Sequence, residues 1–180
     1  MLNAEQIIKE GLLILDETQG KVAQVGYDLS LKSVNKVGTP PTSGGLDHLA
    51  VHHAYKIGKV LKDKTEIATY TPYNTTKVDG CIGYMLYPGV YDITFNEGCN
   101  IPNNRVAFIK QRSSLYRNGA IINSPLFDPG FKTQNMGTLV YVHETIFIEQ
   151  DARVAQIYFH KCDSAEVYEG QFQQDKQRLK

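Results

Sequence analysis

The chain has 180 residues, with 19 basic and 19 acidic side chains and a formal net charge of +0. This length fits one domain, and a hydrophobic fraction of 42% supports a buried core and argues against wholesale disorder. The balanced charge argues against a nucleic-acid-binding protein or a polybasic membrane binder. No apolar run approaches the ~18 residues of a transmembrane helix, and acidic residues flank the first apolar stretch, unlike in a secretory signal.

The N-terminal region predicts one short helix followed by extended segments. Asn3 can cap the helix, Gln6 stands three residues later as in a capping box, and Gly11 suggests an early end. Residues 12–15 then read as a short extended piece. Residues 25–31 alternate between apolar and polar side chains and predict a strand.

The next region is harder to assign to the core of a domain. Residues 34–46 are rich in Gly, Pro, Ser and Thr and predict a loop. Residues 47–64 have apolar side chains at helical spacing, and residues 65–80 are rich in Thr and Tyr and predict extended structure. We interpret the whole stretch 34–80 as an insertion.

The remainder of the chain predicts β-structure. From Ile82 onward, short apolar strands recur at about ten-residue spacing with turn residues between them, a pattern typical of a sandwich or barrel. Residues 139–142 and 146–148 flank residues 143–145 and predict a tight hairpin, and residues 154–159 form the last clear strand. The sequence therefore predicts a mainly β-domain.

Two segments carry side chains suited to phosphate chemistry. Arg112 places a forked donor beside the hydroxyl groups of Ser113 and Ser114, which could cradle a phosphate. Asp128 precedes Pro129-Gly130, and an acid held by a stiff turn can orient and deprotonate a water. Singly these signals are weak, since Arg-Ser-Ser is usually a helix start and Asp-Pro-Gly is usually a turn.

The order of these segments resembles the dCTP deaminase/dUTPase superfamily. The resemblance begins at Gly26-Tyr27-Asp28-Leu29, resumes at residue 87 and runs to about Gln174. Its most specific part is residues 112–119, which are close to the RSSLxRxG element of the family. The remaining matches are Ile122 to Asp128 (third motif), Arg153 to Ile157 (fourth motif) and Tyr168 to Gln173 (the lid segment of the deaminase branch).

This resemblance implies a distorted β-barrel or jelly roll of the dUTPase-like type, in a homotrimer with active sites between subunits. The substrate would be a deoxypyrimidine triphosphate. Residues 1–180 would form one domain, with residues 170–180 as a flexible lid. The three cysteines (Cys81, Cys99 and Cys162) are odd in number and widely spaced, which predicts reduced thiols in a cytoplasmic protein. The cytosol of a bacterium and that of a virus-infected host would both fit.

The resemblance also implies roles for individual residues. Asp128 would contact the sugar and position the water, Asn123 would read the pyrimidine edge, and Asp28 would support the phosphates, with Mg²⁺ as cofactor held through a water. The catalytic residues implied are Asp128, Ser113 and Arg117. The substrate-binding residues implied are Arg112, Ser113, Ser114, Asn123, Phe127, Asp128, Gln156, Tyr168 and Gln174.

One position bears on which reaction is catalysed. The deaminase branch carries a proton-transferring glutamate on the strand after Asp-Pro-Gly, and Val140 stands at that place here, with Glu144 the nearest acid. Because valine cannot transfer a proton, we expect a dUTP diphosphatase that yields dUMP and pyrophosphate. The alternatives are a dCTP deaminase that uses Glu144 or another acid, and a nucleotide-gated binding module without turnover.

Other candidate sites are weaker. His48 and His52 would share one face of a helix and could bind Zn²⁺, but a solvated helix face is the simpler interpretation. His160 and Cys162 alternate at a strand end and are interpreted as structural. Several tyrosines could stack nucleic-acid bases, but no basic stripe accompanies them, so we interpret them as sheet packing.

Overall fold

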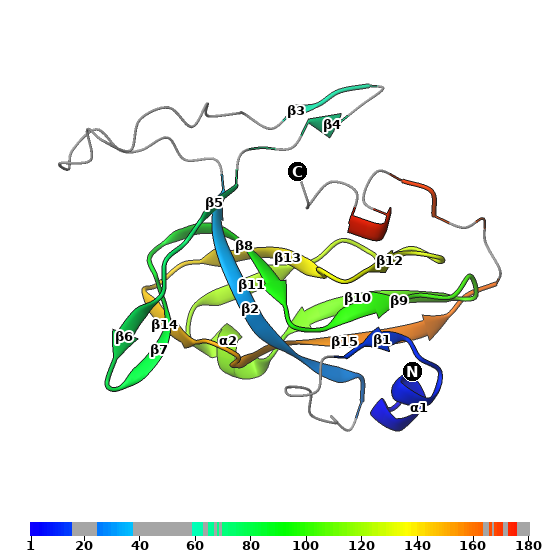
Figure 1. Cartoon of the computed structure of the whole chain (residues 1–180), viewed down its shortest axis with the longest axis horizontal. Helices are drawn as coiled ribbons and strands as arrows, with labels where there is room; N and C mark the ends of the chain where they lie inside the picture. Colours follow the sequence, from blue (N-terminus) through cyan, green and yellow to red (C-terminus); the bar gives the residue numbers. More distant parts are fainter. Residues whose placement is uncertain are drawn as a thin grey trace.

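The chain folds as short strands around one apolar core, as a computed structural model shows (Figure 1). The described residues are 1–15, 25–37, 59–62, 65–66, 68, 70–163, 166, 168–170 and 173–175. The helices are α1 (Ala4–Lys9), α2 (Ser113–Arg117) and the 3-10 helix η1 (Gln173–Asp175). The strands are β1 (Leu13–Ile14), β2 (Tyr27–Val37), β3 (Lys59–Val60), β4 (Thr65–Glu66), β5 (Tyr70–Pro72), β6 (Thr76–Val78), β7 (Cys81–Leu86), β8 (Gly89–Phe95), β9 (Gly98–Asn100), β10 (Arg105–Gln111), β11 (Ala120–Asn123), β12 (Lys132–Thr133), β13 (Gly137–Val142), β14 (Ile146–Glu149) and β15 (Arg153–Lys161).

Most of the long strands belong to one antiparallel sheet that nearly closes into a barrel. Its strand order is β10-β15-β2-β8-β13-β11, with β5 paired to the end of β2. The two edges meet where Ala107 of β10 and Phe127, just after β11, exchange backbone hydrogen bonds of 3.1 and 3.0 Å. The predicted mainly β, barrel-like fold is confirmed.

Smaller sheets extend this barrel. One has the order β1-β9-β12, and another has the order β14-β7-β6 and projects to the left in Figure 1. Strands β3 and β4 pair only with each other among the described residues. None of the helices in the described part of the chain has the length and apolar content that crossing a membrane requires.

The core follows from the alternation of side chains along the strands. On β10, Ala107 and Ile109 are buried, and on the neighbouring β15, Ile157 and Phe159 are fully buried while Tyr158 between them is partly exposed. This period of two places one apolar face of each strand inside the barrel. The polar and aromatic side chains between them remain on the outer face.

The predicted N-terminal helix is confirmed, together with its capping box. The Asn3 side chain accepts a hydrogen bond of 2.9 Å from the Gln6 backbone N–H, and the Gln6 side chain accepts one of 3.1 Å from the Asn3 N–H. Ala4 and Ile7 are the buried residues of α1. The short extended piece after the helix is confirmed as β1.

The strand predicted at residues 25–31 continues further than expected. β2 extends to Val37, into the stretch expected to be a loop, and Val37 pairs with Tyr70 of β5. Both ends of the expected insertion therefore take part in sheets. Residues 38–58, which include His48 and His52, lie outside the described residues.

The helix expected over residues 47–64 is wrong at Lys59–Val60, which form β3 and pair with β4. Val60 is β-branched and lies opposite Thr65, and such residues favour a pleated conformation over a helix. The extended structure expected for residues 65–80 is confirmed in β4, β5 and β6.

The tight hairpin predicted around residues 143–145 is also wrong. Both flanking segments are strands, but β13 pairs with β8 and β11, whereas β14 pairs with β7 in another sheet. Because both edges of β13 are already occupied, no edge remains for β14. The His143 N–H instead donates to Gly119 O at 2.8 Å as the chain leaves the barrel.

Candidate functional site

The first predicted motif lies where β2 meets β15. Asp28 is opposite Gln156 and Tyr27 is opposite Ile157 in this antiparallel pair. Gly26 has a φ of +74°, and a Cβ added there would lie 2.4 Å from the Ile157 backbone oxygen. Only glycine therefore lets β2 start this close to β15, which brings Asp28 and Gln156 together.

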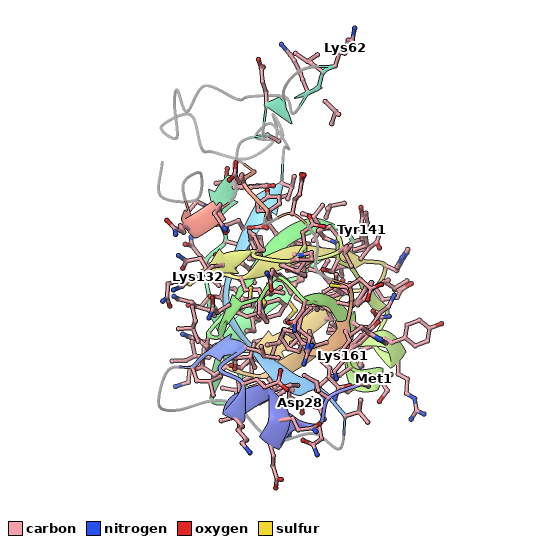
Figure 2. The ribbon with its side chains drawn as sticks, turned by 90° about the vertical axis from the view of Figure 1, so that its right-hand side faces the viewer. Met1, Asp28, Lys62, Lys132, Tyr141 and Lys161 are labelled. Atoms are coloured by element: carbon pink, nitrogen blue, oxygen red, sulfur yellow. The ribbon has the colours of Figure 1, made fainter. Side chains whose placement is uncertain are left out.

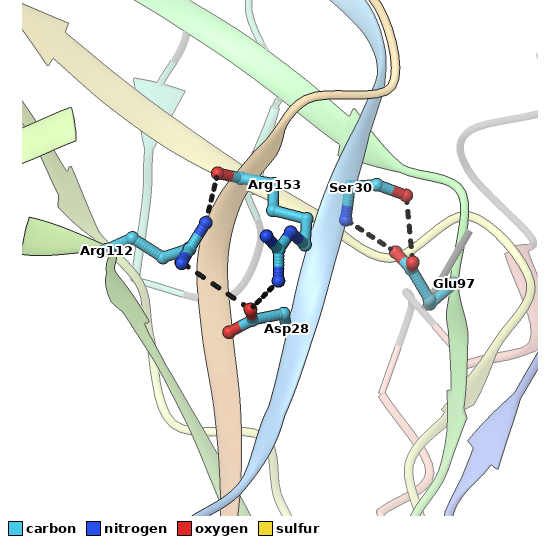
Figure 3. A network of polar contacts seen from close by, with 5 residues as sticks. All are labelled: Asp28, Ser30, Glu97, Arg112 and Arg153. Atoms are coloured by element: carbon cyan, nitrogen blue, oxygen red, sulfur yellow. Dashed lines mark hydrogen bonds and ion pairs between the residues drawn. The ribbon is translucent and has the colours of Figure 1, made fainter. Parts of the chain in front are cut away.

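Asp28 is the centre of a charged cluster, although its residue is only 5% exposed. Its Oδ2 accepts a hydrogen bond of 3.0 Å from Arg153 Nη1 and lies 3.6 Å from Arg112 Nε (Figure 3). Arg112 Nη1 also donates to the Arg153 backbone oxygen at 3.4 Å. Since a buried carboxylate requires paired donors, Asp28 fixes two guanidinium groups side by side.

These arginines keep part of each side chain accessible to a ligand. The side chain of Arg112 is 34% exposed and that of Arg153 is 36% exposed, against 7% for Asp28. Each guanidinium carries five N–H donors, more than Asp28 can accept. Two fixed cations with donors to spare form an arrangement suited to a phosphate chain. Arg153 was not among the residues expected to bind substrate, although it begins the fourth motif.

The segment after β10 confirms a helix start at the Arg-Ser-Ser motif. Arg112 is the N-cap residue of α2 and makes no side-chain capping bond, while its backbone N–H donates to Val154 O at 2.9 Å. Ser113 and Ser114 are exposed in the first turn, and Leu115 is buried and anchors the helix. Arg117 is exposed in the last turn. The two serines thus directly follow Arg112 in the first turn of α2.

The third motif forms a turn at the other end of β10. Asn123 ends β11 with its side chain exposed, and its backbone oxygen accepts a hydrogen bond of 3.4 Å from Thr138 Oγ1. Phe127 is buried, whereas Asp128 is exposed. The Phe131 N–H donates to Asp128 O at 3.1 Å, which closes the turn that presents the Asp128 carboxylate to solvent.

The C-terminal segment packs against this turn. The Tyr168 N–H donates to Pro129 O at 2.9 Å, and the Tyr168 ring lies edge-on to Phe131 with centroids 5.4 Å apart. The Gln173 side chain donates to Gly130 O at 2.8 Å and accepts from the Lys132 N–H at 2.8 Å. The predicted Gln174 is exposed beside it. Gln173 belongs to the expected lid segment but was not among the residues expected to bind substrate, because nothing in a polar tail distinguishes one glutamine from the next.

The expected residues and Arg153 fall into two sets, which are named for the roles that the resemblance implies. The phosphate group comprises Asp28, Arg112, Arg153 and Gln156, where β2 and β15 pair, together with Ser113, Ser114 and Arg117, which follow Arg112 in α2. The base group comprises Asn123, Phe127, Asp128 and Tyr168, around the third motif. Phe127 pairs with Ala107, five residues before Arg112 on β10, a separation of about 16 Å at roughly 3.3 Å per residue. Within one chain, the Asp128 turn therefore lies near the start of β10 and Arg112 lies just past its end.

Strand β13, which follows the Asp128 turn and β12, carries no acid on its buried face. Val140 is 1% exposed and pairs with Ile122 and Tyr91 on either side. Glu144 lies beyond the end of β13, exposed, and its Cβ would be 3.2 Å from a Cβ added at Gly119. This part of β13 cannot transfer protons.

The residues present do not fit a directly bound Mg²⁺ at Asp28. Its carboxylate already pairs with two arginines, which repel a further cation. Among the residues that the structure describes, no three His, Cys, Asp or Glu side chains gather as a metal site.

The other candidate residues take part in packing. His160 lies edge-on to Phe108 and Tyr158, with ring centroids 5.7 Å apart in both cases. The Tyr73 hydroxyl donates to Met85 O at 2.9 Å and the Tyr91 hydroxyl to Tyr87 O at 3.0 Å. These contacts agree with the interpretation of the aromatic residues as sheet packing.

Comparison with known proteins agrees with this geometry. The family model for dCTP deaminase-like proteins matches residues 3–162. A "probable deoxyuridine 5'-triphosphate nucleotidohydrolase" of Halobacterium salinarum is 32% identical over 119 residues, which cover 66% of this chain and 69% of that protein. A deoxyuridine 5'-triphosphate nucleotidohydrolase of Methanocaldococcus jannaschii is 41% identical over 83 residues, covering 46% of this chain and 53% of the relative.

A solved structure shares the fold. The 2'-deoxycytidine 5'-triphosphate deaminase from Agrobacterium tumefaciens aligns with a TM-score of 0.54 and 17% identity, over 86% of this chain. This chain covers 46% of the deaminase chain, and at this identity the likeness shows the fold alone. The family model and the Halobacterium relative show that the chain belongs to the dCTP deaminase-like family, within the dCTP deaminase/dUTPase superfamily.

Proposed function

We propose that the chain hydrolyses dUTP to dUMP and pyrophosphate. The observation that carries this proposal is Val140, an inert side chain at the place where the deaminase pattern has its glutamate, in a chain that keeps the arginine pair at Asp28. Hydrolysis at phosphorus needs a phosphate grip and a base for water, and it does not need the strand glutamate. The names of the Halobacterium and Methanocaldococcus relatives support the same choice.

In this reaction Arg112 and Arg153 hold the phosphate chain, with the hydroxyls of Ser113 and Ser114 and the amide of Gln156 as further donors. Asp128 accepts a proton from a water whose oxygen attacks the α-phosphorus. A new bond forms between water oxygen and phosphorus as the bond to the bridging oxygen breaks, and pyrophosphate leaves. Cations fixed before the substrate binds stabilise the charge that develops on the phosphates. The Mg²⁺ expected for such a reaction would be held by the substrate phosphates, since Asp28 is already paired.

We also propose that a complete site needs more than one subunit. The phosphate group and the base group are separated along β10 within one chain, and α2 and β12 lie apart in Figure 1. A neighbouring copy that presents its Asp128 turn to these arginines would complete the site. The expected homotrimer provides this arrangement three times.

The test is to incubate the protein with dUTP and, separately, with dCTP in Mg²⁺, and to resolve the products by chromatography. Formation of dUMP and pyrophosphate from dUTP, with no ammonia from dCTP, supports the proposal. Ammonia release from dCTP would instead show that Glu144 or another acid transfers protons. Tight binding of both nucleotides without any product would favour a binding module.

A further inference from the structure

A second carboxylate lies buried behind the arginine pair. Glu97, between β8 and β9, is 2% exposed, and no proposed step of the reaction uses it. Its Oε2 accepts a hydrogen bond of 2.9 Å from the Ser30 backbone N–H, and its Oε1 accepts one of 2.9 Å from Ser30 Oγ (Figure 3). The two oxygens of Glu97 thus hold both donors of one residue of β2.

The residue held in this way stands at a β-bulge. Ser30 is opposite Arg153, and the next pair is Leu29 with Ala155, so β15 has one extra residue, Val154, at this point. A bulge bends its strand and re-aims the side chains beside it. Asp28 and Ser30 are two residues apart on β2, and Arg153 of β15 lies opposite Ser30. The bulge therefore sets the position of Arg153 relative to Asp28.

The bulge also positions the other arginine. The backbone oxygen of the extra residue, Val154, accepts the hydrogen bond of 2.9 Å from the Arg112 N–H that begins α2. The oxygen of Arg153 accepts the side-chain hydrogen bond of Arg112. The positions of Arg112 and Arg153 therefore both depend on the backbone of the same bulge.

Asn96 fixes the same residue from a second side. Its side-chain amide donates to Ser30 Oγ at 3.0 Å and to Asp151 Oδ1 at 2.9 Å, and its backbone N–H donates to Ser30 O at 3.0 Å. Asp151 has a φ of +62°, in the left-handed region, just before β15 begins. Glu97, Ser30, Asn96 and Asp151 thus form one polar network that spans the start of β15.

We infer that Glu97 is a positioning residue for phosphate binding: it holds Ser30 so that the bulge in β15 presents Arg112 and Arg153 as a pair. The inference rests on the proposed function only for the identity of the substrate, since the arginine pair would bind any phosphate chain. It also assigns a role to an acid that lies outside the segments from which the site was predicted. Figure 2 shows Asp28, the acid that the two arginines share, at the lower part of the molecule.

Two substitutions of Glu97 separate positioning from acid–base chemistry. In Glu97→Gln, the amide oxygen can accept from the Ser30 N–H and the amide nitrogen can donate to Ser30 Oγ, so both contacts are kept. We expect binding within about threefold of wild type. In Glu97→Ala, both Ser30 donors lose their acceptor, and we expect binding of the triphosphate to weaken by roughly 10- to 100-fold, because small shifts in binding groups are costly.

The measurement is calorimetric affinity for inorganic triphosphate and for a non-hydrolysable α,β-imido analogue of dUTP, together with KM and kcat for dUTP. We expect Glu97→Ala to raise KM far more than it lowers kcat, at a temperature where circular dichroism shows the variant folded. The matched control is Glu10→Ala, which removes the 3.0 Å partner of buried Arg105 on β10 without touching the bulge. It should lower the Tm and leave the affinities unchanged.

If Glu97→Ala does not fold, Ser30→Ala provides the test. It removes the hydroxyl that contacts Glu97 and Asn96 and keeps the backbone hydrogen bond to Glu97. It should weaken inorganic triphosphate binding by about three- to tenfold. Wild-type affinity for inorganic triphosphate in folded Glu97→Ala would overturn the inference. If Ser30→Ala has to replace that variant, wild-type affinity in Ser30→Ala would overturn it in the same way. A Glu97→Gln variant that binds as weakly as Glu97→Ala would also overturn it. Absence of dUTP turnover in the wild type, with the expected losses of triphosphate affinity, would sink the proposed function and leave the inference standing.

Discussion

The phosphate group and the base group are built in different ways. Asp28 is buried in a strand at the centre of the sheet order and holds its arginines at 3.0 and 3.6 Å. Asp128 is exposed in a turn and is supported mainly by backbone hydrogen bonds and by the C-terminal segment around Tyr168. Under the proposed function, this difference means that the arginine pair is in place before the substrate binds, whereas the Asp128 turn depends on a partner subunit and on the C-terminal segment.

The largest effect on kcat is expected from a substitution that disrupts only the base group, at Asp128. Asp128→Asn removes the base for water and keeps the size of the side chain, so kcat for dUTP should fall by about 10²- to 10⁴-fold while affinity for inorganic triphosphate is unchanged. Steady-state kinetics and calorimetry measure the two quantities. The matched control is Asp79→Asn, in the exposed turn between β6 and β7. If kcat survives in Asp128→Asn, another group activates the water.

The next largest effect, on KM, is expected from a substitution that disrupts only the residues of the phosphate group, at Arg153. Arg153→Ala leaves Asp28 with Arg112 only, so KM for dUTP should rise by roughly 10- to 100-fold with a smaller change in kcat. Arg153→Lys should recover little of this loss, because an ammonium group lacks the forked geometry of a guanidinium. The exposed Lys77→Ala on β6 is the control for loss of a positive charge. Equal KM values in all three variants would remove Arg153 from the site.

A smaller effect tests whether the two groups meet between subunits. Arg112→Ala and Asp128→Asn should each be nearly inactive as pure proteins. In trimers reassembled from an equal mixture, a site takes Arg112 from one subunit and Asp128 from another, so about one site in four is intact and about a quarter of wild-type activity should return. If activity does not return although mass spectrometry shows mixed trimers, the groups belong to one chain.

The smallest effect concerns the acid behind the bulge. Burial raises the pKa of Glu97 above its ordinary value of 4.5, against hydrogen bonds from Ser30 that lower it. The folded chain therefore binds this proton more tightly than the unfolded chain, and the resulting stabilisation is full below the ordinary value and is lost as the pH rises through the folded-state pKa.

Glu97→Gln lacks this titration, so the free energy of unfolding of wild type minus that of the variant should fall as the pH rises above the ordinary carboxyl value of 4.5. Urea unfolding at a series of pH values measures this difference. A difference that grows with pH would show instead that the fold stabilises the ionised carboxylate.

The parts of the fold that depend on neighbouring residues could be predicted from sequence. The capping box of Asn3 and Gln6 is a local arrangement, and the alternation from Tyr27 onward marks a strand whatever its partner is. Pairing could not be predicted in the same way. Residues 139–148 contain two strands that alternate correctly, yet the occupied edges of β13 send β14 to β7, and nothing near His143 in the sequence records this.

The candidate site shows the same limit. The segments around Asp28, Arg112 and Asp128 could be found from residue order, because each is a short run with a distinct composition. Glu97 could not, since its importance comes from a contact with Ser30, 67 positions earlier in the chain. Arg153 begins a recognised motif, but its ion pair with Asp28 lies next to a bulge that the local sequence pattern does not predict.

The isolated β-bridge between Ala107 and Phe127, where the two edges of the sheet meet, has a consequence for how the barrel opens. A closure made of two hydrogen bonds can part without unfolding the strands on either side. The Phe127 amide should therefore exchange with solvent deuterium faster than the amides of β15 do. A nucleotide bound at the neighbouring Asp128 would slow that exchange, so one backbone amide would report occupancy of the base group from inside the barrel wall.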